Sequence, residues 1–71
     1  MAESVYKVIE LVGTSTESWE KAAAAAIKQA SETLHDLRIA TVVDLDVQIE
    51  NDEIYLYRAR VKLSFKYHEE E

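Results

Sequence analysis

Residues 38–67 read RIATVVDLDVQIENDEIYLYRARVKLSFKY, and this stretch decides the fold because its side chains alternate in character on both sides of a short polar segment. Such alternation is typical of β-strands that have one apolar face. We predict one strand over Arg38–Glu50 and a second over Ile54–Tyr67. The segment Asn51–Glu53 between them is predicted to be the turn of an antiparallel hairpin. In both strands the odd-numbered positions form the more apolar face.

The apolar faces of the two strands must coincide, and this restricts the register of the hairpin. Pairing Glu50 with Ile54 meets the condition and leaves a three-residue turn. The predicted pairs are Leu45 with Ala59, Val43 with Val61, Thr41 with Leu63, Asp46 with Arg58 and Asp44 with Arg60. Two of these pairs join opposite charges, which supports the register. A register two residues shorter keeps the same parity but places Arg58 opposite Asp44, and it ranks second.

Two further elements are predicted upstream of the hairpin. Ser4–Val12 is rich in β-branched and aromatic residues, so we predict a strand that ends at Gly13. This single glycine is expected to adopt a positive φ or to permit a close approach. A helix is predicted over Thr16–Leu37, capped by Thr14 or Ser15. Its apolar positions recur at steps of three and four and are Trp19, Ala23, Ala26, Ile27, Ala30, Leu34 and Leu37.

The predicted order is therefore β-α-β-β, an α+β fold of a single domain over residues 1–71. One helix covers one face of a three-stranded antiparallel sheet, and the last residues, 68–71, form a frayed acidic tail. The opposite face mixes charged with apolar positions, which predicts an interface between copies. A chain of 71 residues buries only about 60% of its unfolded surface. Self-association, or a cation held by oxygen atoms, is therefore expected to stabilise it.

The composition excludes several classes of protein. Without cysteine, disulfides, thiolate zinc sites and cysteine nucleophiles are excluded. A formal net charge of −6 argues against nucleic acid and against an anionic membrane surface as partners. No apolar run approaches the ~20 residues of a membrane span, and the N-terminus lacks a signal-peptide pattern, so a cytoplasmic location is expected. No nucleophile and base stand together, so we expect no enzyme.

Oxygen-bearing side chains gather in and before the predicted turn, at Asp44, Asp46, Glu50, Asn51, Asp52 and Glu53. Calcium takes about six to eight oxygen ligands, so these residues are candidate ligands, with Asp44, Asp46 and Asp52 as the first choice. The spacing does not match an EF-hand loop, which needs a longer segment and a glycine. The alternative is an ordinary polar turn, which favours Asn and Asp for backbone reasons. Carboxylates near a symmetry axis meet their own copies, which can turn a weak site into a cage.

Three other side chains have two interpretations each. Arg58 and Arg60 can hold a phosphate or carboxylate ligand, although pairing with Asp46 and Asp44 is preferred. Trp19 lies in the apolar stripe of the helix and is expected in the core or in an interface.

The stretch VYKVIELVGTS at residues 5–15, the SW pair before an alanine-rich helix, and VKLSFK at residues 61–66 together resemble the dodecin family. The likeness extends over almost the whole chain, from Ser4 to Tyr67. It implies a sheet wrapped around its helix and a hollow homo-dodecamer of twelve copies. It also implies a non-enzymatic binding protein, because typical members hold flavins such as FMN or riboflavin at subunit interfaces and store or sequester them.

The resemblance also implies a set of site residues. Ile39 stands where typical dodecins place a flavin-stacking tryptophan, Arg58 stands at the position of a hydrogen-bonding glutamine, and Asp44 matches an acidic residue near the site. The absence of the tryptophan predicts weakened flavin stacking. In this respect the chain resembles a divergent branch of the family that is described as calcium-binding. Strict alternation places Ile39 on the helix-facing side, whereas the tryptophan faces an intersubunit pocket. A bulge early in that strand would reconcile the two.

Overall fold

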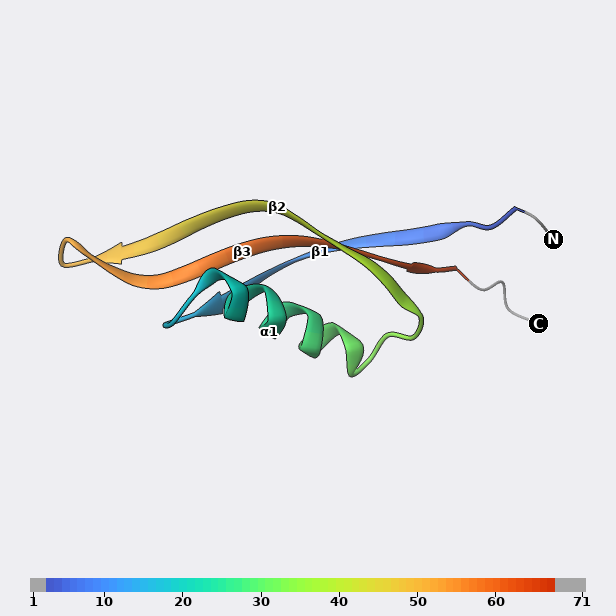
Figure 1. Cartoon of the computed structure of the whole chain (residues 1–71), viewed down its shortest axis with the longest axis horizontal. Helices are drawn as coiled ribbons and strands as arrows, with labels where there is room; N and C mark the ends of the chain where they lie inside the picture. Colours follow the sequence, from blue (N-terminus) through green and yellow to red (C-terminus); the bar gives the residue numbers. More distant parts are fainter. Residues whose placement is uncertain (1–2, 68–71) are drawn as a thin grey trace.

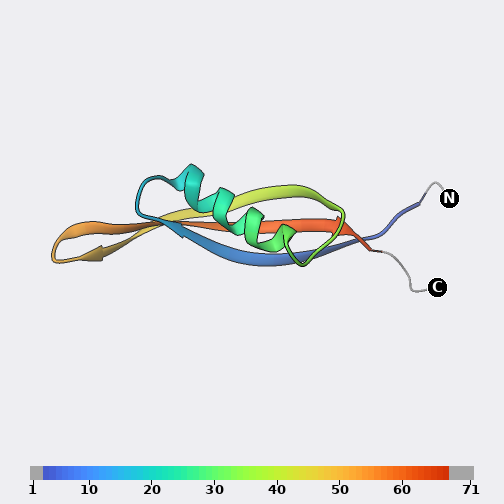
Figure 2. The same ribbon diagram turned by 90° about the horizontal axis from the view of Figure 1, so that it is seen from below.

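The computed structural model describes residues 3–67. Its elements are strand β1 (Tyr6–Ser15), helix α1 (Trp19–Ser31), strand β2 (Leu37–Glu50) and strand β3 (Glu53–Lys66). The strands form one antiparallel sheet in the order β1-β3-β2, and α1 lies across one face of it (Figures 1 and 2). The predicted β-α-β-β fold is therefore confirmed, whereas the predicted tail at 68–71 lies outside the described residues.

Small side chains let α1 approach the sheet closely. The buried core consists of Ala22, Ala26 and Ala30 from α1 and Ala59, Val61 and Leu63 from β3. Opposite the helix, a Cβ atom built on Gly13 would overlap the carbonyl oxygen of Ala22 and lie 3.1 Å from the Cβ of Ala26. Gly13 has no positive φ, so the close approach is the expectation that is confirmed. The prediction that the strand ends there is wrong, since β1 continues to Ser15.

The helix is shorter at both ends than the predicted span of Thr16–Leu37. Its N-cap is Ser18, with extended backbone and a hydroxyl that accepts a hydrogen bond from the Lys21 amide at 3.0 Å. Ser15, a predicted cap, instead accepts the amide of Glu17 and shapes the turn before the helix. After Ser31 the chain must reverse to enter β2, and Asp36 takes a left-handed φ of 62°. Leu37, placed in the helix by its periodicity, pairs with Phe65 in the sheet.

The middle of the hairpin has the predicted register, because Leu45 pairs with Ala59, Asp46 with Arg58 and Asp44 with Arg60. The shorter register is therefore excluded. Before Asp44 the strand contains a bulge, in which Val43 is the extra residue. Val42 then pairs with Val61 and Ala40 with Leu63, so the predicted pairs Val43–Val61 and Thr41–Leu63 are wrong. A bulge inserts one residue into one strand, and it exchanges the two faces of everything beyond it.

The turn of the hairpin also differs from the prediction. Glu50 pairs with Glu53, so the turn has two residues, Asn51 and Asp52, with φ angles of 54° and 61°. Two successive left-handed residues are the conformation that suits the twist of a tight hairpin. A second irregularity leaves Tyr55 without an opposite residue, since Gln48 pairs with Leu56 and Ile49 with Ile54. Ile54 is therefore on the helix side of the sheet, and its predicted place on the other face is wrong.

The cover provided by α1 is uneven. The helix packs mainly over β1 and β3 and touches β2 much less. The β2–β3 hairpin continues past the end of β1, whose last pair joins Ser15 to Tyr57, and projects from one end of a molecule measuring 54 × 20 × 15 Å (Figure 1). Within residues 3–67, no helix has the length and apolar character that a membrane crossing requires.

Candidate functional site

The sheet face opposite α1, called the outer face below, carries charged side chains at its centre. Residues that pair across an antiparallel sheet share a face, so the register identifies these neighbours. They are Arg58 with Asp46, Arg60 with Asp44, and Lys62 with Glu10. The predicted mixture of opposite charges on this face is therefore present, with the cations on the central strand and the acids on both flanking strands.

Asp46 and Arg58 form the best-defined ion pair of this face. The Nε and Nη2 groups of Arg58 donate to Oδ1 and Oδ2 of Asp46 at 2.7 and 3.0 Å. These hydrogen bonds lower the pKa of Asp46 from its ordinary value, and the same contact raises the pKa of Arg58. The bidentate arrangement occupies both oxygens of the carboxylate, so Asp46 is already satisfied by a protein cation.

Asp44 lies one pair further along β2 but has different surroundings. Its cross-strand neighbour Arg60 directs Nη1 toward Oε2 of Glu10 on β1, at 3.7 Å. None of the ion pairs among residues 3–67 includes Asp44, so the predicted pair with Arg60 is a neighbour in register and not a salt bridge. Asp44 therefore presents a carboxylate on the outer face, next to the Asp46–Arg58 pair.

The bulge at Val43 settles the position of Ile39. It pairs Ile39 with Ser64, and this assigns Ile39 to the outer face with Asp44 and Arg58. Strict alternation had placed it on the helix side, and that expectation is wrong. Ile39 is 59% exposed, and no aromatic ring stands in its place. Its partner Ser64 is six residues from Arg58 on β3, which corresponds to about 20 Å along the strand. One copy therefore cannot bring Ile39 and Arg58 to one flavin-sized ligand.

The three predicted metal ligands do not converge. Asp44 and Asp46 are neighbours on β2, whereas Asp52 is at the tip of the hairpin, six residues beyond Asp46 and about 20 Å away along the strand. Among residues 3–67, no group of three His, Asp or Glu side chains is arranged to hold a metal ion. Residues 3–67 of a single copy therefore bring together too few oxygen ligands for calcium. The left-handed backbone at Asn51 and Asp52 explains their presence in the turn.

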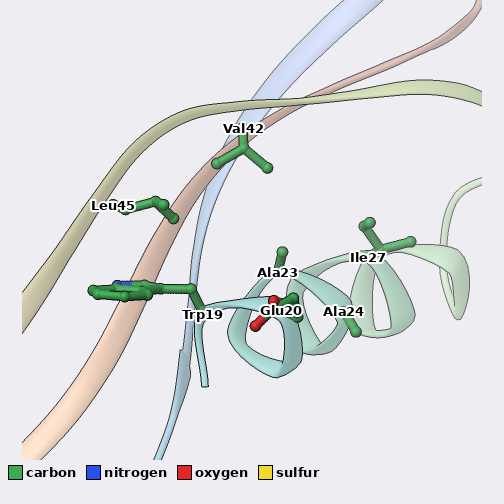
Figure 3. Close-up of a pocket in the computed structure, with 7 residues that line it drawn as sticks. All are labelled: Trp19, Glu20, Ala23, Ala24, Ile27, Val42 and Leu45. Carbon is green, nitrogen blue, oxygen red and sulfur yellow. The ribbon is translucent and has the colours of Figure 1, made fainter.

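A second feature, on the helix side, is an open apolar groove between α1 and β2 with a volume of ≈ 560 Å³ (Figure 3). Its lining is Trp19, Glu20, Ala23, Ala24, Ile27, Val42 and Leu45. The Trp19 indole Nε1–H donates to the carbonyl oxygen of Asp46 at 3.0 Å, and its ring meets Tyr57 edge-on at 5.1 Å. The sequence did not predict this groove, because strict alternation placed Val42 on the outer face, away from α1. The only available signal was the wide apolar stripe of the helix.

Comparison with known proteins gives a consistent family assignment. The family model described as Dodecin matches residues 5–68. The calcium dodecin of Mycobacterium tuberculosis is 43% identical over 63 residues, which are 89% of this chain and 89% of that protein.

Solved structures agree with this match. The dodecin of Streptomyces coelicolor has a TM-score of 0.92 at 33% identity, over 99% of this chain and 100% of that one. The crystal structure of the M. tuberculosis calcium dodecin, described as having a novel calcium-binding site, has a TM-score of 0.83 at 40% identity, over 96% of this chain and 97% of that one. The chain therefore belongs to the dodecin family.

Proposed function

We propose that this protein is a non-enzymatic homo-oligomeric dodecin that binds a divalent cation at the interfaces between its copies, with calcium as the preferred ion. The observation that carries the proposal is the carboxylate of Asp44, which stands on the outer face outside every ion pair of residues 3–67. The 43% identity with a calcium dodecin supports calcium as the ion. Position 39 is an isoleucine and offers no aromatic ring for a flavin to stack on, which also favours a cation over a flavin as the ligand.

The proposal requires several copies. Calcium needs about six to eight oxygens, and a single copy gathers no such set among its described residues. Carboxylates near a rotation axis meet their own copies, so the proposal places Asp44 or Asp52 of neighbouring copies near such an axis, where they supply the missing ligands. Asp46 is assigned a structural role, because Arg58 holds both of its oxygens. A dodecamer is the assembly that we propose, with each chain as one domain.

Titration calorimetry with calcium chloride tests this function. We expect heat of binding with the wild-type protein at or below millimolar calcium, and its loss or a large reduction in Asp44→Asn. Asp52→Asn tests the hairpin tip separately. Glu20→Gln is the control, because Glu20 lies on the helix and outside the outer face. No heat with the wild-type protein at millimolar calcium would refute cation binding and leave flavin binding or a purely structural assembly.

Flavin binding or storage is the second candidate function, because typical dodecins bind flavins. Ile39 and Arg58 of one copy lie about 20 Å apart along the strand, so we propose that a flavin would contact them, with Asp44, from different copies. Quenching of FMN or riboflavin fluorescence measures it. Stacking contributes about 1–3 kcal/mol per ring, so Ile39→Trp is expected to tighten flavin binding by about fivefold or more. A flavin affinity that Ile39→Trp leaves unchanged would count against this site.

A further inference from the structure

Arg60 stands at the centre of the outer face, between acids on both flanking strands. Its direct neighbours in the register are Asp44 on β2 and Val12 on β1, and Glu10 lies two residues before Val12 on the same face. Direct neighbours across an antiparallel pair have Cβ atoms about 4.5–5.5 Å apart, whereas diagonal neighbours are about 7–8 Å apart. The register by itself therefore favours Asp44 over Glu10 as the ion-pair partner of Arg60.

The guanidinium of Arg60 nevertheless turns toward β1. Its Nη1 lies 3.7 Å from Oε2 of Glu10, and no ion pair within the described part of the chain joins it to Asp44. It remains within electrostatic reach of β2, because the pKa of Asp46, lowered chiefly by the hydrogen bonds from Arg58, is lowered further by the charge of Arg60. One guanidinium therefore has carboxylates on both flanking strands within range, and Glu10 holds it.

The charges around Arg60 leave one carboxylate over. Between the rows of Lys62 and Arg58, the outer face carries as many carboxylates as cations. They are Arg58, Arg60 and Lys62 on β3, Asp44 and Asp46 on β2, and Glu10 on β1. Arg58 is held by Asp46, and Lys62, the direct neighbour of Glu10, is in none of the ion pairs of the described chain. Glu10 therefore has two cations beside it, while Asp44 is paired with neither.

The position of Arg60 affects what Asp44 can bind. A carboxylate that is paired with a guanidinium has its oxygens engaged in charge-assisted hydrogen bonds. The positive charge next to it also repels a second cation. With Arg60 drawn to Glu10, the exposed carboxylate of Asp44 keeps its oxygens available for an ion that prefers oxygen ligands.

We propose that Glu10 is a positioning residue of the cation site, because it holds Arg60 toward β1 and thereby leaves the carboxylate of Asp44 open to the divalent cation. Glu10 is not itself a ligand and acts through Arg60. The inference rests on the proposed function, whereas the placement of Arg60 can be measured without calcium.

Titration calorimetry on a double-mutant cycle tests the role of Glu10 toward the cation. Glu10→Gln should weaken calcium binding by about two- to fivefold, since Arg60 then turns to Asp44. Removing a negative charge also weakens binding by itself, so the same substitution is made in Arg60→Gln as the matched control. In that background Glu10→Gln should weaken binding by a smaller factor, because no guanidinium is released. An equal effect in both backgrounds, or none in the wild-type protein, overturns the proposal.

Urea unfolding in the presence of a chelator gives a readout that needs no calcium. Asp44→Asn should raise the equilibrium constant of unfolding by about two- to fivefold more in the Glu10→Gln background than in the wild type, because Arg60 pairs with Asp44 only in the former. The excess should disappear when Arg60→Gln is added. Each comparison is made at one protein concentration, since association also affects stability.

The two measurements separate the proposals. If Asp44→Asn has the same effect in every background, Glu10 does not control Arg60, and the positioning role is overturned while calcium binding by the wild type stands. If the wild type gives no heat with calcium, the cation function is overturned together with the role of Glu10 toward it, and the unfolding cycle still decides which carboxylate holds Arg60.

Discussion

At Gly13 the sheet approaches the backbone of α1 closely, and Gly13→Ala tests this packing directly. The added Cβ would overlap the carbonyl oxygen of Ala22 and press on the Cβ of Ala26 at 3.1 Å. Backbone of the helix cannot rotate away as a long side chain can, so α1 must move off β1. Overpacking of this kind costs about 1–3 kcal/mol, and the lower entropy of the unfolded alanine chain offsets about 0.4–1 kcal/mol of it.

Because the added Cβ meets helix backbone, the cost lies in the upper part of that range, about 2–3 kcal/mol, and the net loss is about 1–2.6 kcal/mol. This corresponds to a fall in Tm of roughly 4–20 °C for a domain of this size. Circular dichroism during heating measures it, at one fixed protein concentration because association also raises Tm. Thr14→Ala is the control, since Thr14 is the adjacent exposed residue of the same strand. If Gly13→Ala melts at the wild-type temperature, the close approach of α1 to β1 is refuted.

Three further predictions concern single contacts. Asp46→Asn removes the carboxylate whose pKa Arg58 lowers from 3.8. The stabilisation of the folded state by this ionised carboxylate is complete above pH 3.8 and is lost as the pH falls through the lower folded-state pKa, so the wild type should resist urea better than the variant at pH 7 but not in strong acid. Trp19→Phe removes the hydrogen bond to the Asp46 carbonyl and should lower the free energy of unfolding by about 0.5–1.5 kcal/mol, and an equal or higher value would contradict the contact. Asp52→Gly relieves a left-handed φ of 61° and should raise that free energy by about 0.5–1 kcal/mol, whereas a loss would show that the Asp52 side chain stabilises the turn.

Local chemistry made most of the fold predictable. Two alternating strands around a polar turn predict a hairpin. Matching their apolar faces left two registers, and the preferred one, with Asp46 opposite Arg58 and Asp44 opposite Arg60, is the one that the structure contains. The alanine run predicted the helix but not its ends, because Ser18 and Ser15 are equally good caps by composition. For Gly13 the sequence predicted either a positive φ or a close approach, and the structure shows the close approach.

The candidate site was less predictable, because its geometry depends on a bulge in β2 and on contacts between strands that are distant in the sequence. The residue types at positions 42–44 do not indicate that Val43 is the extra residue of a bulge. This bulge nevertheless decides that Ile39 lies on the outer face. Likewise, the choice of Arg60 between Asp44 and Glu10 depends on β1, which is far away in the sequence and adjacent to β3 only in the folded sheet.

The sequence by itself determined the order of elements, the central register of the hairpin and the kinship with dodecins, since these follow from periodicity and from residue types that act locally. Only the tertiary structure decided which carboxylate is taken by an arginine, which face Ile39 joins, and where apolar surface is left uncovered. The physical reason is that a one-residue bulge changes which face a side chain joins without changing the alternating pattern of the strand, and that the neighbours of Arg58 and Arg60 come from strands that meet only in the folded sheet.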